Sequence, residues 1–84
     1  MNPYVKALTP QPDYRLLLEF ETGEKRLFDA TPYLDRGVFA ALRNSSVFKM
    51  AKVIAGSVEW PGELDLSYDT LYLESAPLTQ GHAA

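Results

Sequence analysis

Four carboxylates in the last third of the chain have the side chains best suited to chemistry: Glu59, Glu63, Asp65 and Asp69. Paired carboxylates bind divalent cations, or act as general acid and base, when their geometry is suitable. Their spacing matches no calcium-binding loop, and acidic residues are also common at helix starts. We therefore expect a solvated acidic face with one helix-capping carboxylate, and retain a small metal-dependent hydrolase using these four residues as an alternative function.

Few other side chains could take part in catalysis. His82 is the only histidine, and the chain has no cysteine. Zinc sites and nucleophilic triads need several such residues together. No serine lies in a nucleophile-elbow pattern, and the glycines form no phosphate-binding loop. The sequence thus predicts no catalytic residue, no metal ligand and no cofactor, and we expect a protein that is not an enzyme.

Charge and hydropathy narrow the classes of partner. Eight basic and 11 acidic residues give a net charge of −3, with no basic stripe. Binding to a phosphate backbone depends on such a stripe, so direct nucleic-acid binding is not expected. The first residues do not resemble a signal peptide, and no apolar run reaches membrane-spanning length. We expect a cytoplasmic protein that does not act at a membrane.

The length of 84 residues predicts one domain, over residues 1–78, followed by a flexible C-terminal tail over residues 79–84. A hydrophobic content of 46% is typical of a globular chain. Small domains gain stability from disulfides, metals or oligomerisation. With no cysteine and one histidine, oligomerisation is the route that remains.

Period-two alternation predicts strands in the first third of the chain. Prolines at both ends of residues 3–10 suit an edge strand. Residues 14–20 place Leu16, Leu18 and Phe20 on one face, and alternation resumes over residues 25–30 after a turn at Gly23. These two runs predict a β-hairpin.

Short helices and a second β region follow. Residues 38–43 predict a helix with Val38, Phe39 and Leu42 on one stripe, and Asn44-Ser45-Ser46 is expected to end that helix and to cap a further turn. A β-bulge or a tight hairpin is expected at Gly56, ahead of the corner that begins at Trp60. Ser67 is expected to cap a last helical turn over residues 68–72. The predicted fold class is α+β: a curved antiparallel β-sheet of about four to five strands with short helices packed on it.

The order of these features resembles the small bacterial domain-of-unknown-function family 2442 over roughly residues 3–76. The most specific stretches are Val58-Glu59-Trp60-Pro61, Asp65-Leu66 and Asp69-Thr70-Leu71-Tyr72. The chain departs from the family in having Gly62-Glu63 where Asn-Gly is common, and Tyr68 where proline is common. The resemblance implies a compact α+β domain with no assigned catalytic residues. In this family some members are joined to a helix-turn-helix, and others stand beside genes for small toxin-like proteins.

The function expected from these observations is that of a non-enzymatic protein–protein interaction module, in a toxin–antitoxin-like or regulatory context. Its partner would be a second copy, as a homodimer, or a small partner protein. A further alternative is a DNA-linked regulator that acts through a partner.

Four apolar residues are candidates for the interface. In a single sheet with helices on one side, the face assigned to Tyr4, Leu17 and Phe28 would be exposed, and a second chain could cover it. Trp60 has two interpretations. It is either a core residue beside Val58, or an exposed interface anchor, since aromatic residues dominate binding hot spots.

Overall fold

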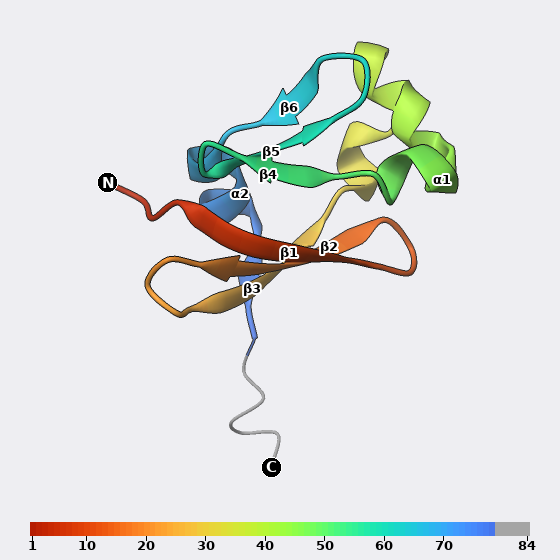
Figure 1. Ribbon diagram of the computed structural model, residues 1–84. Helices are drawn as coiled ribbons and strands as arrows, with labels where there is room; N and C mark the ends of the chain where they lie inside the picture. The colour runs from red at the N-terminus through yellow and green to blue at the C-terminus, as the bar shows by residue number, and fades with distance from the viewer. Residues whose placement is uncertain (79–84) are drawn as a thin grey trace.

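Seven β-strands form two antiparallel sheets in the computed structural model of the protein, which describes residues 1–78 (Figure 1). The four-stranded sheet has the order β1-β2-β3-β7, with bounds Val5–Gln11, Arg15–Phe20, Lys25–Asp29 and Ala76–Pro77. The three-stranded sheet has the order β4-β5-β6, with bounds Lys52–Ile54, Ser57–Trp60 and Leu64–Leu66. The predicted α+β class with antiparallel strands and short helices is confirmed, and the strands are divided between two sheets. The predicted tail, residues 79–84 with His82, lies outside the described residues.

Four short helices connect the strands: the 3₁₀-helices η1 (Thr31–Tyr33) and η2 (Gly37–Arg43), and the α-helices α1 (Ser45–Phe48) and α2 (Tyr68–Glu74). Two predicted caps are confirmed, because Asn44 accepts a hydrogen bond from the Ser46 N–H and Ser67 accepts one from the Thr70 N–H. No helix within residues 1–78 is long and apolar enough to cross a membrane.

The predicted stripe of the helix over residues 38–43 is partly wrong. Leu42 is buried and Phe39 packs on the core, but the side chain of Val38 is 71% exposed. The segment is a 3₁₀-helix, in which residues three apart align along one edge. Phe39 and Leu42 share that edge, and Val38 lies off it.

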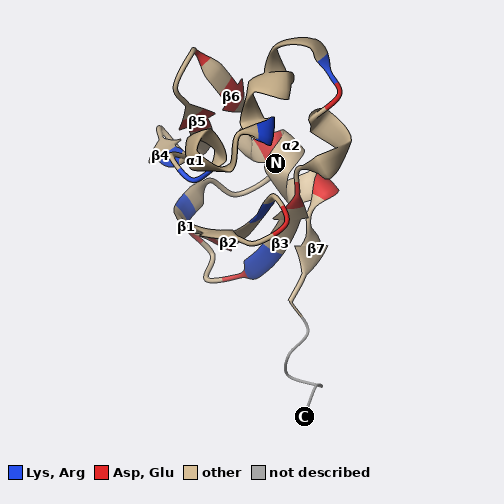
Figure 2. Ribbon diagram, turned by 90° about the vertical axis from the view of Figure 1, so that its right-hand side faces the viewer, with Lys and Arg blue, Asp and Glu red and all other residues tan. Residues whose placement is uncertain are grey.

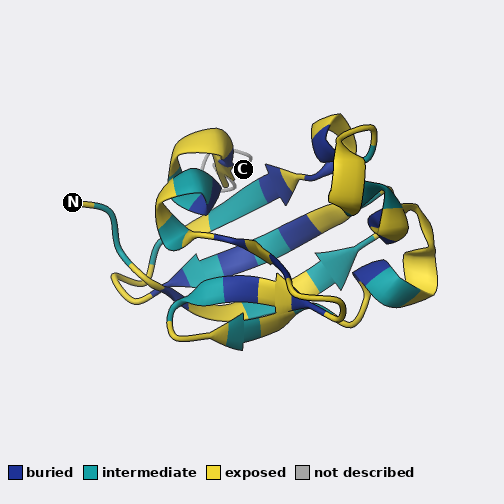
Figure 3. Cartoon of the chain, turned by 90° about the horizontal axis from the view of Figure 1, so that it is seen from above, coloured by how far each residue is buried: buried dark blue, intermediate teal, exposed yellow. Residues whose placement is uncertain are grey.

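The core lies between the two sheets. The three-stranded sheet and both α-helices lie on one side of the four-stranded sheet (Figure 1). Leu16, Leu18 and Phe20 of β2 are fully buried there, facing a cluster that includes Val58 of β5 and Leu71 of α2. Along the strands, buried residues alternate with more exposed ones (Figure 3). One face of the four-stranded sheet therefore belongs to the core, and the other does not.

The two sheets meet at the turn between β4 and β5. Ala55 and Gly56 have φ angles of 51° and 82°, as in a tight two-residue hairpin, so the tight hairpin is the correct one of the two predicted arrangements. The Val5 N–H donates to the Gly56 carbonyl at 2.9 Å. A Cβ at position 56 would lie 2.8 Å from the Cβ of Tyr4, so only glycine allows these two segments of the chain to approach so closely.

A β-bulge in β1 changes which of its residues face the core. The register shifts between Val5 and Ala7. After the shift Ala7 is exposed and Leu8 packs against the core, whereas simple alternation places Ala7 with Val5. The period-two alternation that predicts a strand over residues 3–10 therefore assigns Ala7 and Leu8 to the wrong faces.

The prediction that Phe28 lies on the exposed face is also wrong, because its side chain is 0% exposed. Phe28 pairs directly with Leu16, and directly opposed residues in an antiparallel pair point to the same side of the sheet. Leu17 pairs with Leu27 on the opposite side. Leu27, and not Phe28, therefore lies beside Leu17 on the face outside the core.

Trp60 belongs to the core, so its alternative assignment to an interface is wrong. Its side chain is 3% exposed. The indole Nε1–H donates to the Phe48 carbonyl at 2.9 Å, and the two rings stack with centroids 6.0 Å apart. A buried tryptophan needs such a partner for its N–H.

Candidate interaction surface

The outer face of the four-stranded sheet, defined as the side turned away from the three-stranded sheet, presents an ordered array of side chains. Strand register arranges them in three rows that run across β1, β2 and β3. We name these the glutamate row, the leucine row and the arginine row: Ala7–Glu19–Lys25, Thr9–Leu17–Leu27 and Gln11–Arg15–Asp29. Ala76 of β7 continues the leucine row beside Leu27. The surface thus has an apolar centre with charged residues on both sides.

The leucine row holds the apolar side chains of this surface. Leu17 and Leu27 are half-buried, although no helix or second sheet within residues 1–78 lies over this face (Figure 1). Their partial burial comes from neighbours within the sheet. Thr9 and Ala76 at the two ends of the row are exposed. Part of each leucine side chain is therefore available to a partner.

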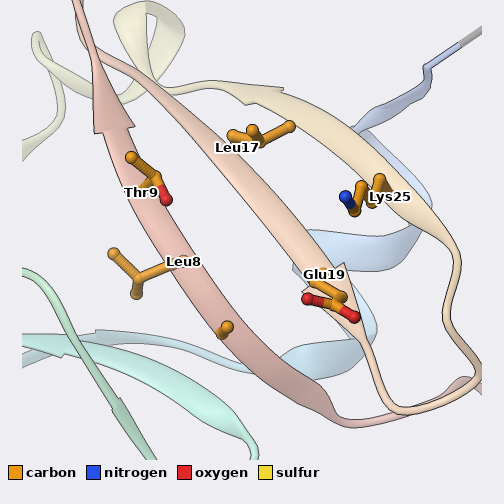
Figure 4. Close-up of a pocket in the computed structure, with 6 residues that line it drawn as sticks. Leu8, Thr9, Leu17, Glu19 and Lys25 are labelled. Carbon is orange, nitrogen blue, oxygen red and sulfur yellow. The ribbon is translucent and has the colours of Figure 1, made fainter.

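Two shallow hollows lie beside the leucine row. One is lined by Thr9, Leu17, Glu19 and Lys25, with Ala7 and Leu8 (Figure 4). The other lies towards the arginine row and is lined by Gln11, Pro12, Asp13, Arg15 and Leu27. Neither is an enclosed cavity for a small molecule. Hollows of this shape can accept side chains from a protein surface.

Charges of both signs flank the leucine row. Figure 2 shows acidic and basic residues close together on the strands of this sheet. In the glutamate row Glu19 lies opposite Lys25 in the strand register, and in the arginine row Arg15 lies opposite Asp29. Arg15 also lies 3.6 Å from Asp13, and Asp29 accepts hydrogen bonds from the Thr31 N–H and hydroxyl. The sign of the charge alternates along each row and between the rows.

On the core side of β3, a polar cluster attaches α2 to the sheet. Arg26 donates to the Ser75 hydroxyl at 2.8 Å, to the Ser75 carbonyl at 2.6 Å and to Glu24 at 2.8 Å. Its guanidinium lies 4.3 Å from the centre of the Tyr72 ring. The Tyr72 hydroxyl donates to Glu24 at 2.7 Å. These bonds pair the polar groups with one another, so the cluster has a structural role.

The same hydrogen bonds shift two pKa values. The Tyr72 hydroxyl, and then Arg26, hold the pKa of Glu24 below its ordinary value. The hydrogen bond to Glu24 raises the pKa of Tyr72. At neutral pH Glu24 is therefore ionised and Tyr72 is protonated, which is the state that keeps α2 attached. Neither group is suited to proton transfer near pH 7.

The acidic residues considered for chemistry are spread over three elements. Glu59 of β5 lies opposite Asp65 of β6, and Lys52 of β4 lies on its other side. Glu63 is in a turn with a φ of 64°, and Asp69, in the first turn of α2, accepts a hydrogen bond from Asn2 at 3.0 Å. In the described part of the chain no three acidic or histidine side chains are close enough to hold a metal ion. The geometry brings two of the four carboxylates together, not all four.

Of the residues proposed for an interface, only Leu17 lies at the centre of the outer face. Tyr4 precedes β1 and is 47% exposed, but its ring packs edge-on against Tyr68 with centroids 4.6 Å apart. It lies beside the Gly56 turn, away from the leucine row. Leu27 was not identified from the sequence. Pairing it with Leu17 across the hairpin is the signal that could have found it.

Comparison with known proteins gives one match. The model of a family described as "Protein of unknown function (DUF2442)" matches residues 5–77. No curated protein and no solved structure matches the chain.

Proposed function

Because the chain belongs to the DUF2442 family, whose description names no reaction, we propose its function from its surface: a non-enzymatic protein–protein interaction module of the cytoplasm. The binding surface is the outer face of the four-stranded sheet. Its partner is a protein, either a second copy or a small partner protein.

The observation that carries this proposal is the Leu17–Leu27 pair at the centre of a sheet face that no other element of the described chain covers. Protein interfaces combine an apolar centre with a polar rim, which is the arrangement of the three rows. Antiparallel sheets often leave one face in water, but that face is then mostly polar. Two adjacent leucines at the centre of this face favour a face that a partner protein covers.

Photo-crosslinking in living cells tests the proposal. A photoreactive amino acid replaces Leu17 in the full chain, and in a matched control it replaces Glu59, which is exposed on the three-stranded sheet. We expect a discrete crosslinked product from position 17 and none from position 59, because only the first lies in the binding surface. Mass spectrometry then identifies the linked protein.

Two outcomes would overturn the proposed function. One is the absence of any protein adduct at position 17. The other is the same set of adducts from both positions, which would indicate random collision. Thermal unfolding of both purified variants verifies that each one is folded.

A further inference from the structure

We infer that the partner of the outer face is a second copy of the chain, related by a twofold axis that runs along the leucine row. This inference rests on the proposed function, and it adds the identity and orientation of the partner. The axis would lie between the four-stranded sheets of the two copies, perpendicular to their strands. Most homodimers are twofold, because one self-complementary surface is enough to form them.

Rotation about the leucine row places each strand over its own copy with its direction reversed. The leucine row then meets itself, so Leu17 contacts the partner's Leu17 and Leu27 contacts the partner's Leu27. The glutamate row and the arginine row exchange places, because they lie on either side of the axis at equal spacing along the strands. Sheets stacked face to face commonly keep their strands within about 30° of each other, which this arrangement permits.

The exchange of rows brings opposite charges together. Glu19 lies over the partner's Arg15, and Lys25 lies over the partner's Asp29. Each contact occurs twice by symmetry, so all four charged positions of the two rows meet a charge of opposite sign. At the uncharged end Ala7 lies over the partner's Gln11. Complementary charges at an interface fix the register of the partners and exclude wrong arrangements.

The other face-to-face twofold arrangement is much less favourable. An axis along β2 would place Glu19 over the partner's Glu19 and Arg15 over the partner's Arg15. Like charges opposed at an interface strongly disfavour association. It would also place Leu27 over the partner's Thr9, so that only Leu17 would still meet its own copy. The charge pattern therefore selects the axis along the leucine row.

A charge-exchange experiment tests this orientation. Arg15→Glu alone would oppose Glu19 of the partner, and Glu19→Arg alone would oppose Arg15. We expect each purified variant to self-associate about tenfold or more weakly than wild type, because two attractive contacts become repulsive. Mixed in equal amounts, the two variants should associate with an affinity close to that of wild type, since both contacts of the mixed dimer again pair opposite charges.

Sedimentation equilibrium measures the association, and Glu59→Arg on the three-stranded sheet is the matched charge reversal that should leave it unchanged. The mixing step distinguishes an effect on the contacts between chains from an effect on the folding of each chain. Each substitution also disturbs a neighbour within its own chain, but only a contact between chains is restored by mixing. Should either variant fail to fold, Lys25→Asp and Asp29→Lys test the second contact in the same way.

Two results would overturn the inference. A mixture that associates no more tightly than the separate variants would exclude this axis. Wild type that stays monomeric at high micromolar concentration would exclude a second copy as the partner. In that second case, a crosslink from position 17 to a different protein would leave the proposed function intact, so the two failures can be told apart.

Discussion

Trp60→Ala is expected to lower the free energy of unfolding by about 3–5 kcal/mol, because loss of a buried ring removes its transfer free energy and leaves a cavity. The indole is almost fully buried, stacks on Phe48 and donates its N–H to the Phe48 carbonyl. Truncation to alanine removes the stacking and the hydrogen bond together. The α1 segment that carries Phe48 thereby loses this contact with β5.

Chemical denaturation of the purified chain measures this effect. Trp60→Phe is the matched control, since it keeps a buried aromatic ring while it loses the donor and only part of the ring volume. Its expected cost is about 1–3 kcal/mol, from the lost hydrogen bond and the smaller ring, while the Phe48 carbonyl still accepts from the Ala51 N–H. An unchanged denaturation midpoint for Trp60→Ala would show that the ring does not contribute to the core.

Phe28→Ala is expected to cost about 3–5 kcal/mol, for the same reason of lost transfer energy and cavity formation. Its neighbour Leu27 points to the other face of β3 and is half-buried. Leu27→Ala in the monomer should therefore cost about 1 kcal/mol or less, as for a substitution outside the core. The two variants therefore compare how much each face of β3 contributes to the stability of the monomer.

Denaturation at low protein concentration, where association does not contribute, provides the comparison. A larger loss of stability for Leu27→Ala than for Phe28→Ala would contradict the strand register. It would indicate that Leu27, and not Phe28, faces the core. Similar costs for both variants would also contradict the register, because they would indicate a sheet that is covered on both sides.

Features set by local chemistry could be predicted from the sequence. The hairpin of β2 and β3 follows from alternation and from Gly23, whose φ is 92°. Ser67 and Asn44 cap helices because their oxygens accept hydrogen bonds from nearby N–H groups. The change of parity between Val53 and Val58 predicts a β-bulge or a tight hairpin at Gly56, and the structure has the tight hairpin. Each of these depends on residues that are close in the chain.

Features set by long-range contacts could not be predicted. The division into two sheets depends on β1 meeting the Gly56 turn, far along the chain. The bulge in β1 leaves no mark in its alternation. The face of Phe28 depends on hairpin register, and apolar residues on both faces of β3 conceal that register. Leu17 could be placed on the outer face because β2 has a regular pattern, whereas Leu27 could not.

The claim that copies of the chain meet through the outer face is tested most directly by light scattering at high micromolar concentration. Wild type is expected to have the mass of two chains. Leu17→Glu is expected to have the mass of one, because the dimer would bury an unpaired charge at its centre. Ile54→Glu, on the exposed side of β4, is the matched control and should remain a dimer. A monomeric wild type, or a dimer that persists unchanged in Leu17→Glu, would contradict the claim.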